Sequence, residues 1–108
     1  MAKRRIKFAD LTIANAGTTS GVLTIPKEVS ELVVHRNGAL TGTVTVHGSL
    51  DASAYDPLYD VVGAKNITIG ADKVQHFNVG GLTGIKLISG SAEGAERDFI
   101  VAGVVDQL

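Results

Sequence analysis

Short runs of alternating apolar and polar residues, each closed by a turn former, constrain the fold of this chain most. The clearest run is residues 43–50. Its two-residue period predicts one inward face (Val44, Val46 and Leu50) and one outward face (Thr43, Thr45, His47 and Ser49). Such runs recur about every 8 to 12 residues, a spacing typical of β-sandwiches and barrels. Valine, isoleucine and threonine supply 30 of the 108 residues, and these β-branched side chains favour strands.

The same pattern, followed along the chain, predicts eight or nine short strands, at residues 6–14, 21–25, 32–37, 43–50, 58–62, 66–69, 74–79, 84–89 and 98–105. The alternation skips a step at Ala9-Asp10, which indicates a bulge in the first strand. Helix is limited to single turns, at residues 26–32 and 91–97. Parallel strands need longer crossovers, so we expect a mostly antiparallel arrangement.

The expected fold is therefore all-β: an antiparallel β-sandwich of the jelly-roll or immunoglobulin-like type. The alternation directs ten side chains into its core: Ile6, Leu11, Val22, Val34, Val44, Val46, Ile67, Phe77, Leu87 and Phe99. The length allows one hydrophobic core and no second. We expect residues 6–108 to form a single β-sandwich domain and residues 1–5 to form a basic N-terminal arm.

Composition excludes several classes of protein. Ten basic and eleven acidic residues argue against direct binding of nucleic acid, which favours a strongly basic chain. The absence of cysteine excludes disulfides, thiolate zinc sites and a cysteine nucleophile. No window has the roughly 18 apolar residues of a membrane-spanning helix, and no secretion signal is evident, so neither membrane insertion nor secretion is expected.

Histidines and aspartates are the first candidates for catalysis or metal binding. His35, His47 and His76 lie on separate expected strands, and none has the spacing of a metal motif. We interpret them as solvated strand residues. Asp51, Asp56 and Asp60 surround one loop, but the loop lacks the oxygen spacing and the glycine of a calcium loop. Aspartates are also common turn formers, and we adopt that interpretation here.

The remaining candidates for enzymatic chemistry are equally weak. A carboxylate pair for glycoside hydrolysis, drawn from these aspartates or from Glu93 and Glu96, would need an aromatic cleft, and the chain has five aromatic residues and no tryptophan. The glycine-rich residues 78–84 lack the Lys-Ser/Thr pair and the following helix of a phosphate loop. We therefore expect no enzymatic activity, no cofactor and no metal.

One cluster of like charges stands out near the N-terminus, formed by Lys3, Arg4, Arg5 and Lys7. Such a cluster favours docking on an acidic surface. A frayed, solvated terminus explains it as well. We take residues 3–8 as the candidate partner-binding site, in which the four cations meet acidic groups while Ile6 and Phe8 anchor by apolar burial.

Three segments, residues 42–51 (GTVTVHGSLD), 57–60 (PLYD) and 84–101 (GIKLISGSAEGAERDFIV), resemble small β-sandwich virion proteins of tailed bacteriophages. The resemblance covers roughly residues 11–105, and the last segment is its most distinctive part. It implies a head decoration (cement) protein that binds the assembled capsid and stabilises it. The implied partners are the major capsid protein and further copies of the chain, a trimer being the expected oligomer. Synthesis in the host cytoplasm and a place on the capsid exterior follow.

An alternative function remains open. The same β-module would suit a tail, baseplate or fibre, where it would contact host glycan or another tail protein. Copy number separates the two, because decoration proteins occur hundreds of times per virion and baseplate modules far less often. A bacterial adhesion or enzyme-accessory domain would require the secretion signal that the sequence does not show.

Overall fold

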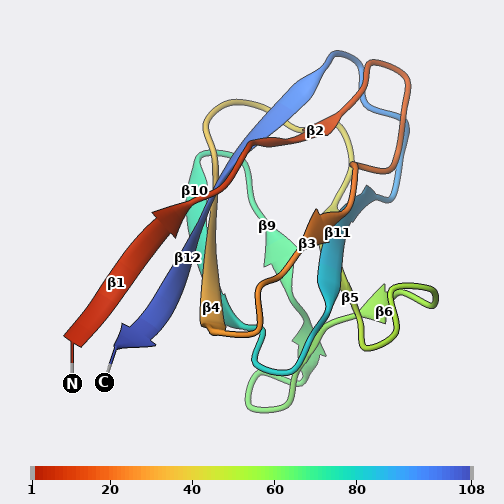
Figure 1. The fold of residues 1–108 in the computed structure, drawn as a ribbon. Coiled ribbons are helices and arrows are strands. Elements are labelled where there is room, and N and C mark those ends of the chain that lie inside the picture. Colours follow the sequence, from red (N-terminus) through yellow and green to blue (C-terminus); the bar gives the residue numbers. More distant parts are fainter. Residues whose placement is uncertain (1, 108) are drawn as a thin grey trace.

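A computed structural model describes residues 2–107, with side chains for residues 3–105. Most of the chain forms two antiparallel sheets that face each other (Figure 1). The first sheet has the order β1 (Ala2–Lys7), β12 (Arg97–Gln107), β4 (Val29–Arg36) and β10 (Lys73–Asn78), and β2 (Leu11–Ile13) also pairs with β12. The second has the order β3 (Leu23–Thr24), β11 (Gly84–Ser89), β5 (Val44–Ser49) and β6 (Asp56–Pro57), and β9 (Thr68–Ile69) also pairs with β5. The short strands β7 (Tyr59–Asp60) and β8 (Lys65–Asn66) form a separate hairpin.

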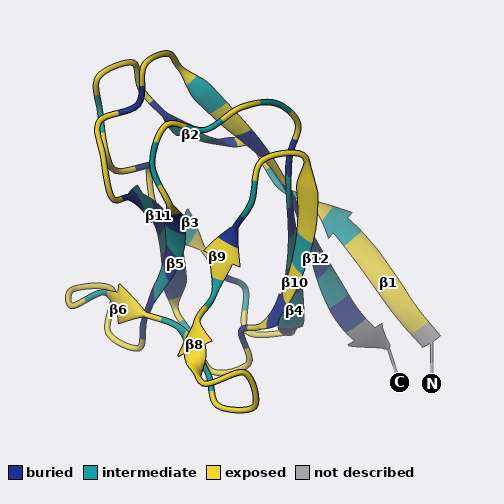
Figure 2. Ribbon diagram, turned by 180° about the vertical axis from the view of Figure 1, so that it is seen from behind, coloured by how far each residue is buried: buried dark blue, intermediate teal, exposed yellow. Residues whose placement is uncertain are grey.

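The antiparallel β-sandwich predicted from the sequence is confirmed, because every strand pair is antiparallel and the core lies between the sheets. Buried residues occur along β4 and β12 of the first sheet and along β5 and β11 of the second (Figure 2). Of the ten predicted core side chains, seven are buried, namely Leu11, Val34, Val44, Val46, Phe77, Leu87 and Phe99. Ile6 and Ile67 are half-buried and pack against this core. The prediction for Val22 was wrong, since its side chain is 53% exposed just before β3.

The end of β5 departs from the predicted alternation. The strand stops at Ser49, and Leu50 turns outward with 74% of its side chain exposed. Ser49, expected outside, is buried, and its hydroxyl donates to the Asp51 carboxylate at 2.9 Å. Both predictions were wrong because the following loop folds back over Ser49 and ends the strand before Leu50.

Several predicted elements have different bounds. The expected strand 6–14 is two strands, β1 and β2, and the skip at Ala9-Asp10 marks the crossing between them. The expected strand 58–62 becomes β7 and a hairpin tip, where Val62 is 99% exposed. Neither helical turn forms: β4 begins at Val29, and residues 91–96 form a loop before β12. Residues 2–107 contain no helix, and therefore none that could cross a membrane.

Candidate partner-binding surface

The basic N-terminal residues belong to strand β1. Their register with β12 runs from Ala2 opposite Gln107 to Lys7 opposite Ala102. The segment expected to be an arm, from residue 2 onward, is therefore hydrogen-bonded into the first sheet. Pairing of β12 with β4 ends at Val105, so the last β1–β12 pairs project beyond the sheet as a ribbon (Figure 1). Met1 lies outside the described residues.

The two apolar residues of the predicted site face the protein's own core. Ile6 and Phe8 are half-buried and pack against the core cluster. The Phe8 ring lies over Gly103 of β12, so closely that a Cβ atom at that position would stand 2.7 Å from its Cε2 atom. Gly103 thus makes room for the ring. Ile6 and Phe8 therefore hold β1 on the sandwich.

An apolar patch covers the outer face of the first sheet. Residues opposite one another in adjacent strands share a face, so Ile100, His35 and Val74 form one row across β12, β4 and β10. Ala102 and Val33 form the next row. We call the outer patch the set Val33, His35, Val74, Ile100, Ala102 and Val104, which together with Arg5 line a hollow of about 420 Å³. Val74 is 54% exposed and Ile100 is 42% exposed.

Charged groups border the outer patch unequally. Arg5 of β1 lies opposite Val104 and beside the hollow. Lys7, opposite Ala102, donates to the Asp10 carboxylate at 3.2 Å and to the carbonyl of Phe8 at 2.7 Å. At the border away from β1, the Nδ1 atom of His76 lies 3.2 Å from the Oε1 atom of Glu31. The β1 border is therefore cationic, whereas the opposite border carries a carboxylate beside an imidazole.

The three histidines lie on three different strands, β4, β5 and β10. His35 belongs to the outer patch and His76 contacts Glu31. His47 is on β5 in the second sheet, where burial, and then the positive charge of Lys86, lower its pKa. In the part of the chain that the structure describes, no three histidine, aspartate or glutamate side chains are grouped to hold a metal ion.

Two aspartates of the 51–60 region, Asp51 and Asp60, serve turns, whereas Asp56 belongs to strand β6 and the interpretation as a turn former does not hold for it. One carboxylate oxygen of Asp51 accepts the N–H groups of Ser53 at 2.9 Å and Ala54 at 3.0 Å, and these bonds lower the pKa of Asp51. Asp60 accepts the N–H groups of Val62 and Gly63 in the same way. These bonds agree with the predicted role of turn formers.

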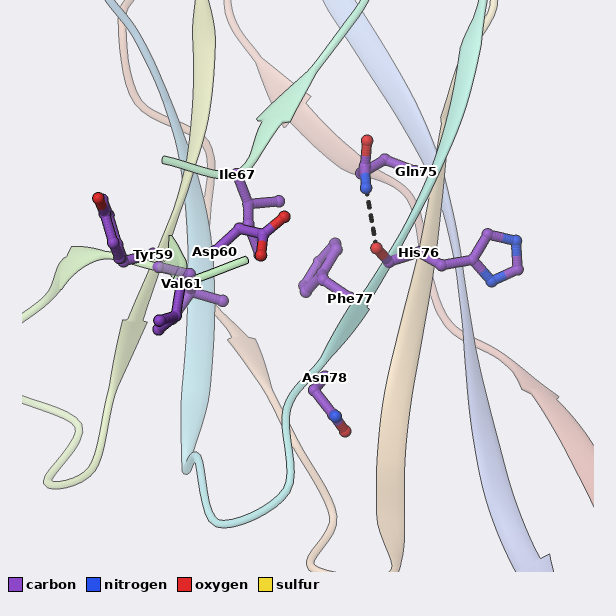
Figure 3. A pocket seen from close by; sticks show the side chains of 9 residues that line it. Tyr59, Asp60, Val61, Ile67, Gln75, His76, Phe77 and Asn78 are labelled. Atoms are coloured by element: carbon purple, nitrogen blue, oxygen red, sulfur yellow. Dashed lines mark hydrogen bonds between the residues drawn. The ribbon is translucent and has the colours of Figure 1, made fainter. Parts of the chain in front are cut away.

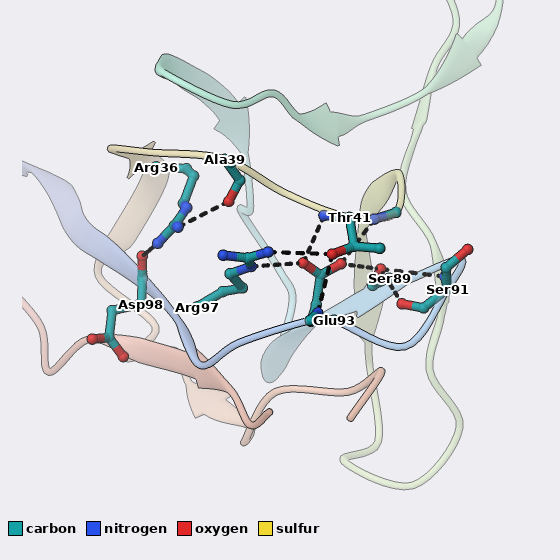
Figure 4. A network of polar contacts seen from close by, with 10 residues as sticks. Arg36, Ala39, Thr41, Ser89, Ser91, Glu93, Arg97 and Asp98 are labelled. Atoms are coloured by element: carbon teal, nitrogen blue, oxygen red, sulfur yellow. Dashed lines mark hydrogen bonds and ion pairs between the residues drawn. The ribbon is translucent and has the colours of Figure 1, made fainter. Parts of the chain in front are cut away.

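Glu93 is the carboxylate whose surroundings the sequence did not reveal. It is buried, and its two oxygens accept the N–H groups of Thr41 at 2.8 Å and Gly42 at 2.9 Å, the Ser89 hydroxyl at 2.7 Å and the Arg97 guanidinium at 2.9 Å (Figure 4). Burial alone would raise the pKa of Glu93, but these donors outweigh it and lower the pKa to about 2. With four donors on its two oxygens, the Glu93 carboxylate holds the surrounding loops together. Glu96, the other glutamate considered for a carboxylate pair and set aside, is exposed.

A second hollow, of about 360 Å³, lies between the β7–β8 hairpin and β10 (Figure 3). Its walls include Tyr59, Asp60, Ile67 and Phe77. The His76 ring points away from it in Figure 3, and Asp60 is occupied by its turn. The glycine-rich residues 78–84 connect β10 of the first sheet to β11 of the second, through a turn in which the Leu82 N–H donates to the Val79 carbonyl. The interpretation of this segment as a hairpin connection was wrong, because β10 and β11 belong to different sheets and do not pair.

Comparison with known proteins informs the fold. No family model and no curated protein sequence matches the chain. Among solved structures, the SPBc2 prophage-derived protein YomS is similar with a TM-score of 0.66 and 13% identity, over 95% of this chain and 93% of that one. A subunit of Bacillus endospore appendage pili (13% identity; 99% of this chain, 88% of that one) and the Yersinia pseudotuberculosis-derived mitogen (14%; 99% and 90%) each give a TM-score of 0.49.

Proposed function

We propose that this chain is a non-enzymatic structural protein of a phage particle, which binds the exterior of the assembled capsid as a decoration protein and stabilises it. The observation that carries the proposal is the outer patch. It is an apolar surface on the first sheet, bordered by cations, and no described residue near it forms catalytic machinery. An exposed apolar area of this kind on a soluble domain marks an interaction site.

The physics of decoration fits such a surface. A ligand that binds the assembled shell and not its separate subunits stabilises the shell by mass action. The contact needs a rigid sheet and a complementary surface, with no chemical step. Exposed ion pairs contribute only about 0–1 kcal/mol each, so the cations on β1 cannot supply the affinity alone. The outer patch would supply most of it, within an interface of about 800 Å² per partner.

The phage assignment is supported by the resemblance of residues 84–101 to phage virion proteins and by the shared fold of a prophage-derived protein. The partner we propose is the major capsid protein, presenting an apolar surface with acidic groups beside it. Self-association as a trimer over a capsomer junction belongs to the same proposal.

Binding to purified shells tests the proposal. Ile100→Asp places a charge in the outer patch, and Val62→Asp is its matched control at an exposed valine on the hairpin tip. We expect the native chain and Val62→Asp to saturate shells at hundreds of copies and Ile100→Asp to bind at least tenfold more weakly. Equal binding of the two variants would contradict the role of the patch. A few copies on purified tails, with none on shells, would favour the tail-module alternative.

A further inference from the structure

Strand β1 has one edge that no strand within residues 2–107 covers. In this described part of the chain, β1 is the terminal strand of the first sheet and pairs only with β12. The N–H of Phe8 donates to the carbonyl of Val101 at 3.0 Å. Because hydrogen-bonded and non-bonded pairs alternate along an antiparallel ladder, Ile6 and Arg4 also direct their backbone groups to β12. The backbone N–H and C=O groups of Arg5 and Lys7 therefore point to the open edge.

The side chains along this edge select what can pair with it. Four of the five residues from position 3 to position 7 are cationic, and all four are exposed. Two copies of β1 placed edge to edge would bring these like charges together, and lysines on edge strands are a common protection against such pairing. The same charges attract a strand that carries carboxylates.

The other terminal strand on the path of the first sheet, β10, has a less open edge and fewer cations than β1. Next to β10 lies the β7–β8 hairpin, whose residues Tyr59, Asp60 and Val61 share a hollow with residues 75–78 of β10. A single cation, Lys73, belongs to β10. The β1 edge is thus the more open of the two and the one with a strong charge preference.

We propose that the open edge of β1 accepts an extended acidic segment of the partner as a further antiparallel strand of the first sheet. The inference rests on the proposed function, because it specifies how the partner meets the border of the outer patch. Backbone groups of Arg5 and Lys7 would pair with the incoming strand, which is the mode of recognition known as strand addition. Its side chains on the outer face would continue the outer patch beyond Arg5.

Two peptides of opposite charge test the charge preference. The probes are eight-residue peptides with alternating glutamate and valine, or alternating lysine and valine, added to the full-length isotope-labelled chain. We expect the acidic peptide to bind and to slow amide hydrogen exchange at Arg5 and Lys7 at least tenfold, while amides in β11 stay unchanged. Equal binding of the basic peptide, or no added protection at Arg5 and Lys7, would overturn the inference.

Two variants at one position separate backbone pairing from charge. Arg5→Ala removes the charge and keeps the N–H group, whereas Arg5→Pro removes both. Proline is tolerated on an edge strand where its nitrogen faces solvent. We expect Arg5→Ala to weaken peptide binding a few-fold and Arg5→Pro to weaken it at least tenfold more, with matching melting temperatures as the folding control. Equal binding by the two variants would exclude strand addition.

A second measurement keeps the test valid if Arg5→Pro does not fold. Acidic peptides N-methylated either on every valine or on every glutamate lose the N–H groups of one edge only. Strand addition predicts that the two methylated peptides bind the native chain with different affinity. Purely electrostatic attraction predicts equal affinity, and that result would overturn the inference.

Shell binding distinguishes this inference from the proposed function. Suppose that Ile100→Asp no longer binds shells while Arg5→Pro and Arg5→Ala bind them equally. That result would support docking through the outer patch and contradict strand addition. Suppose instead that the native chain does not bind shells but the acidic peptide binds the edge of β1. That result would contradict capsid decoration and support strand addition by a different acidic partner.

Discussion

At the scale of single residues, Glu93 is the side chain on which most of the loop structure depends. Its carboxylate joins the loop before β5 to the loop before β12, and its backbone exchanges hydrogen bonds with Ala16 and Gly17. Nearby, the buried Arg36 donates to the carbonyls of Asp98 and Ala39 (Figure 4). Three loops distant in sequence are thereby held at one end of the sandwich.

Replacing Glu93 by glutamine should destabilise the fold by about 3 kcal/mol, because the Arg97 guanidinium then lacks its buried counter-charge and one oxygen acceptor becomes a donor. Chemical denaturation measures the change. The matched control is Glu96→Gln at an exposed position, which should alter stability by less than about 0.5 kcal/mol. Equal effects of the two substitutions would contradict the structural role of Glu93.

The same carboxylate predicts a dependence of stability on pH. The pKa of Glu93 is about 2 in the folded protein, against the ordinary value of 4.5 for a glutamate side chain. A lowered folded pKa means that the contribution to stability is present above the unfolded pKa and is lost as pH falls through the folded value. The difference in unfolding free energy between the native chain and Glu93→Gln should therefore be constant above about pH 5.5 and shrink steadily toward pH 2. A difference in unfolding free energy that stays constant from about pH 5.5 to about pH 2 would contradict the lowered pKa of Glu93.

At the scale of elements, β1 depends on one aromatic contact. The ring of Phe8 occupies the space left by Gly103, and the neighbouring Ile6 packs against the core. The rest of β1 is cationic and exposed, so little else besides backbone pairing keeps it on β12.

Truncating Phe8 to alanine should therefore loosen β1 before it unfolds the sandwich. Amide hydrogen exchange at Arg4 and Ile6, whose N–H groups face β12, should accelerate far more than exchange at Val34 in the centre of the sheet. Gly103→Ala should have the same effect, since the new Cβ displaces the ring. Uniform acceleration across both sheets would show that β1 and the core open together.

At the scale of the whole molecule, the proposed attachment to shells would combine a contribution that salt screens with one that it does not. Cations on β1 are exposed, so salt weakens their attraction, whereas burial of the outer patch is insensitive to screening. Raising salt from low concentration to about 0.5 M should lower shell occupancy moderately and leave substantial binding. Co-sedimentation with shells measures it. Complete release by salt would assign the affinity to charge alone, and no change would remove β1 from the interface.

Local pattern was enough to predict the class of fold. Alternation in residues 43–50 and 98–105 identifies β5 and most of β12, and it correctly buries Val44, Val46 and Phe99. Where a strand ends is less predictable. Leu50 was expected inside, but it lies just past the end of β5 and is exposed.

The candidate site was predicted in part. The cationic residues were found from sequence as a cluster, and the structure places them along one open edge. Ile6 and Phe8 were expected to serve a partner and instead pack against the core, which no local pattern distinguishes. The outer patch was missed, although alternate apolar residues on both faces of residues 98–105 are a visible signal for it.

The amino-acid sequence by itself determined the all-β class, the antiparallel arrangement and the charge of the first residues, because these depend on residue type and on a two-residue period. Tertiary structure alone decided that the opposite face of β12 would stay exposed at Ile100, which is as β-branched and apolar as the buried Val101. It also decided that Glu93 would be buried, through donors such as Thr41 that are 52 residues away. The exposure of Ile100 and the burial of Glu93 depend on contacts between segments distant in the sequence, and a local sequence pattern does not contain information about those contacts.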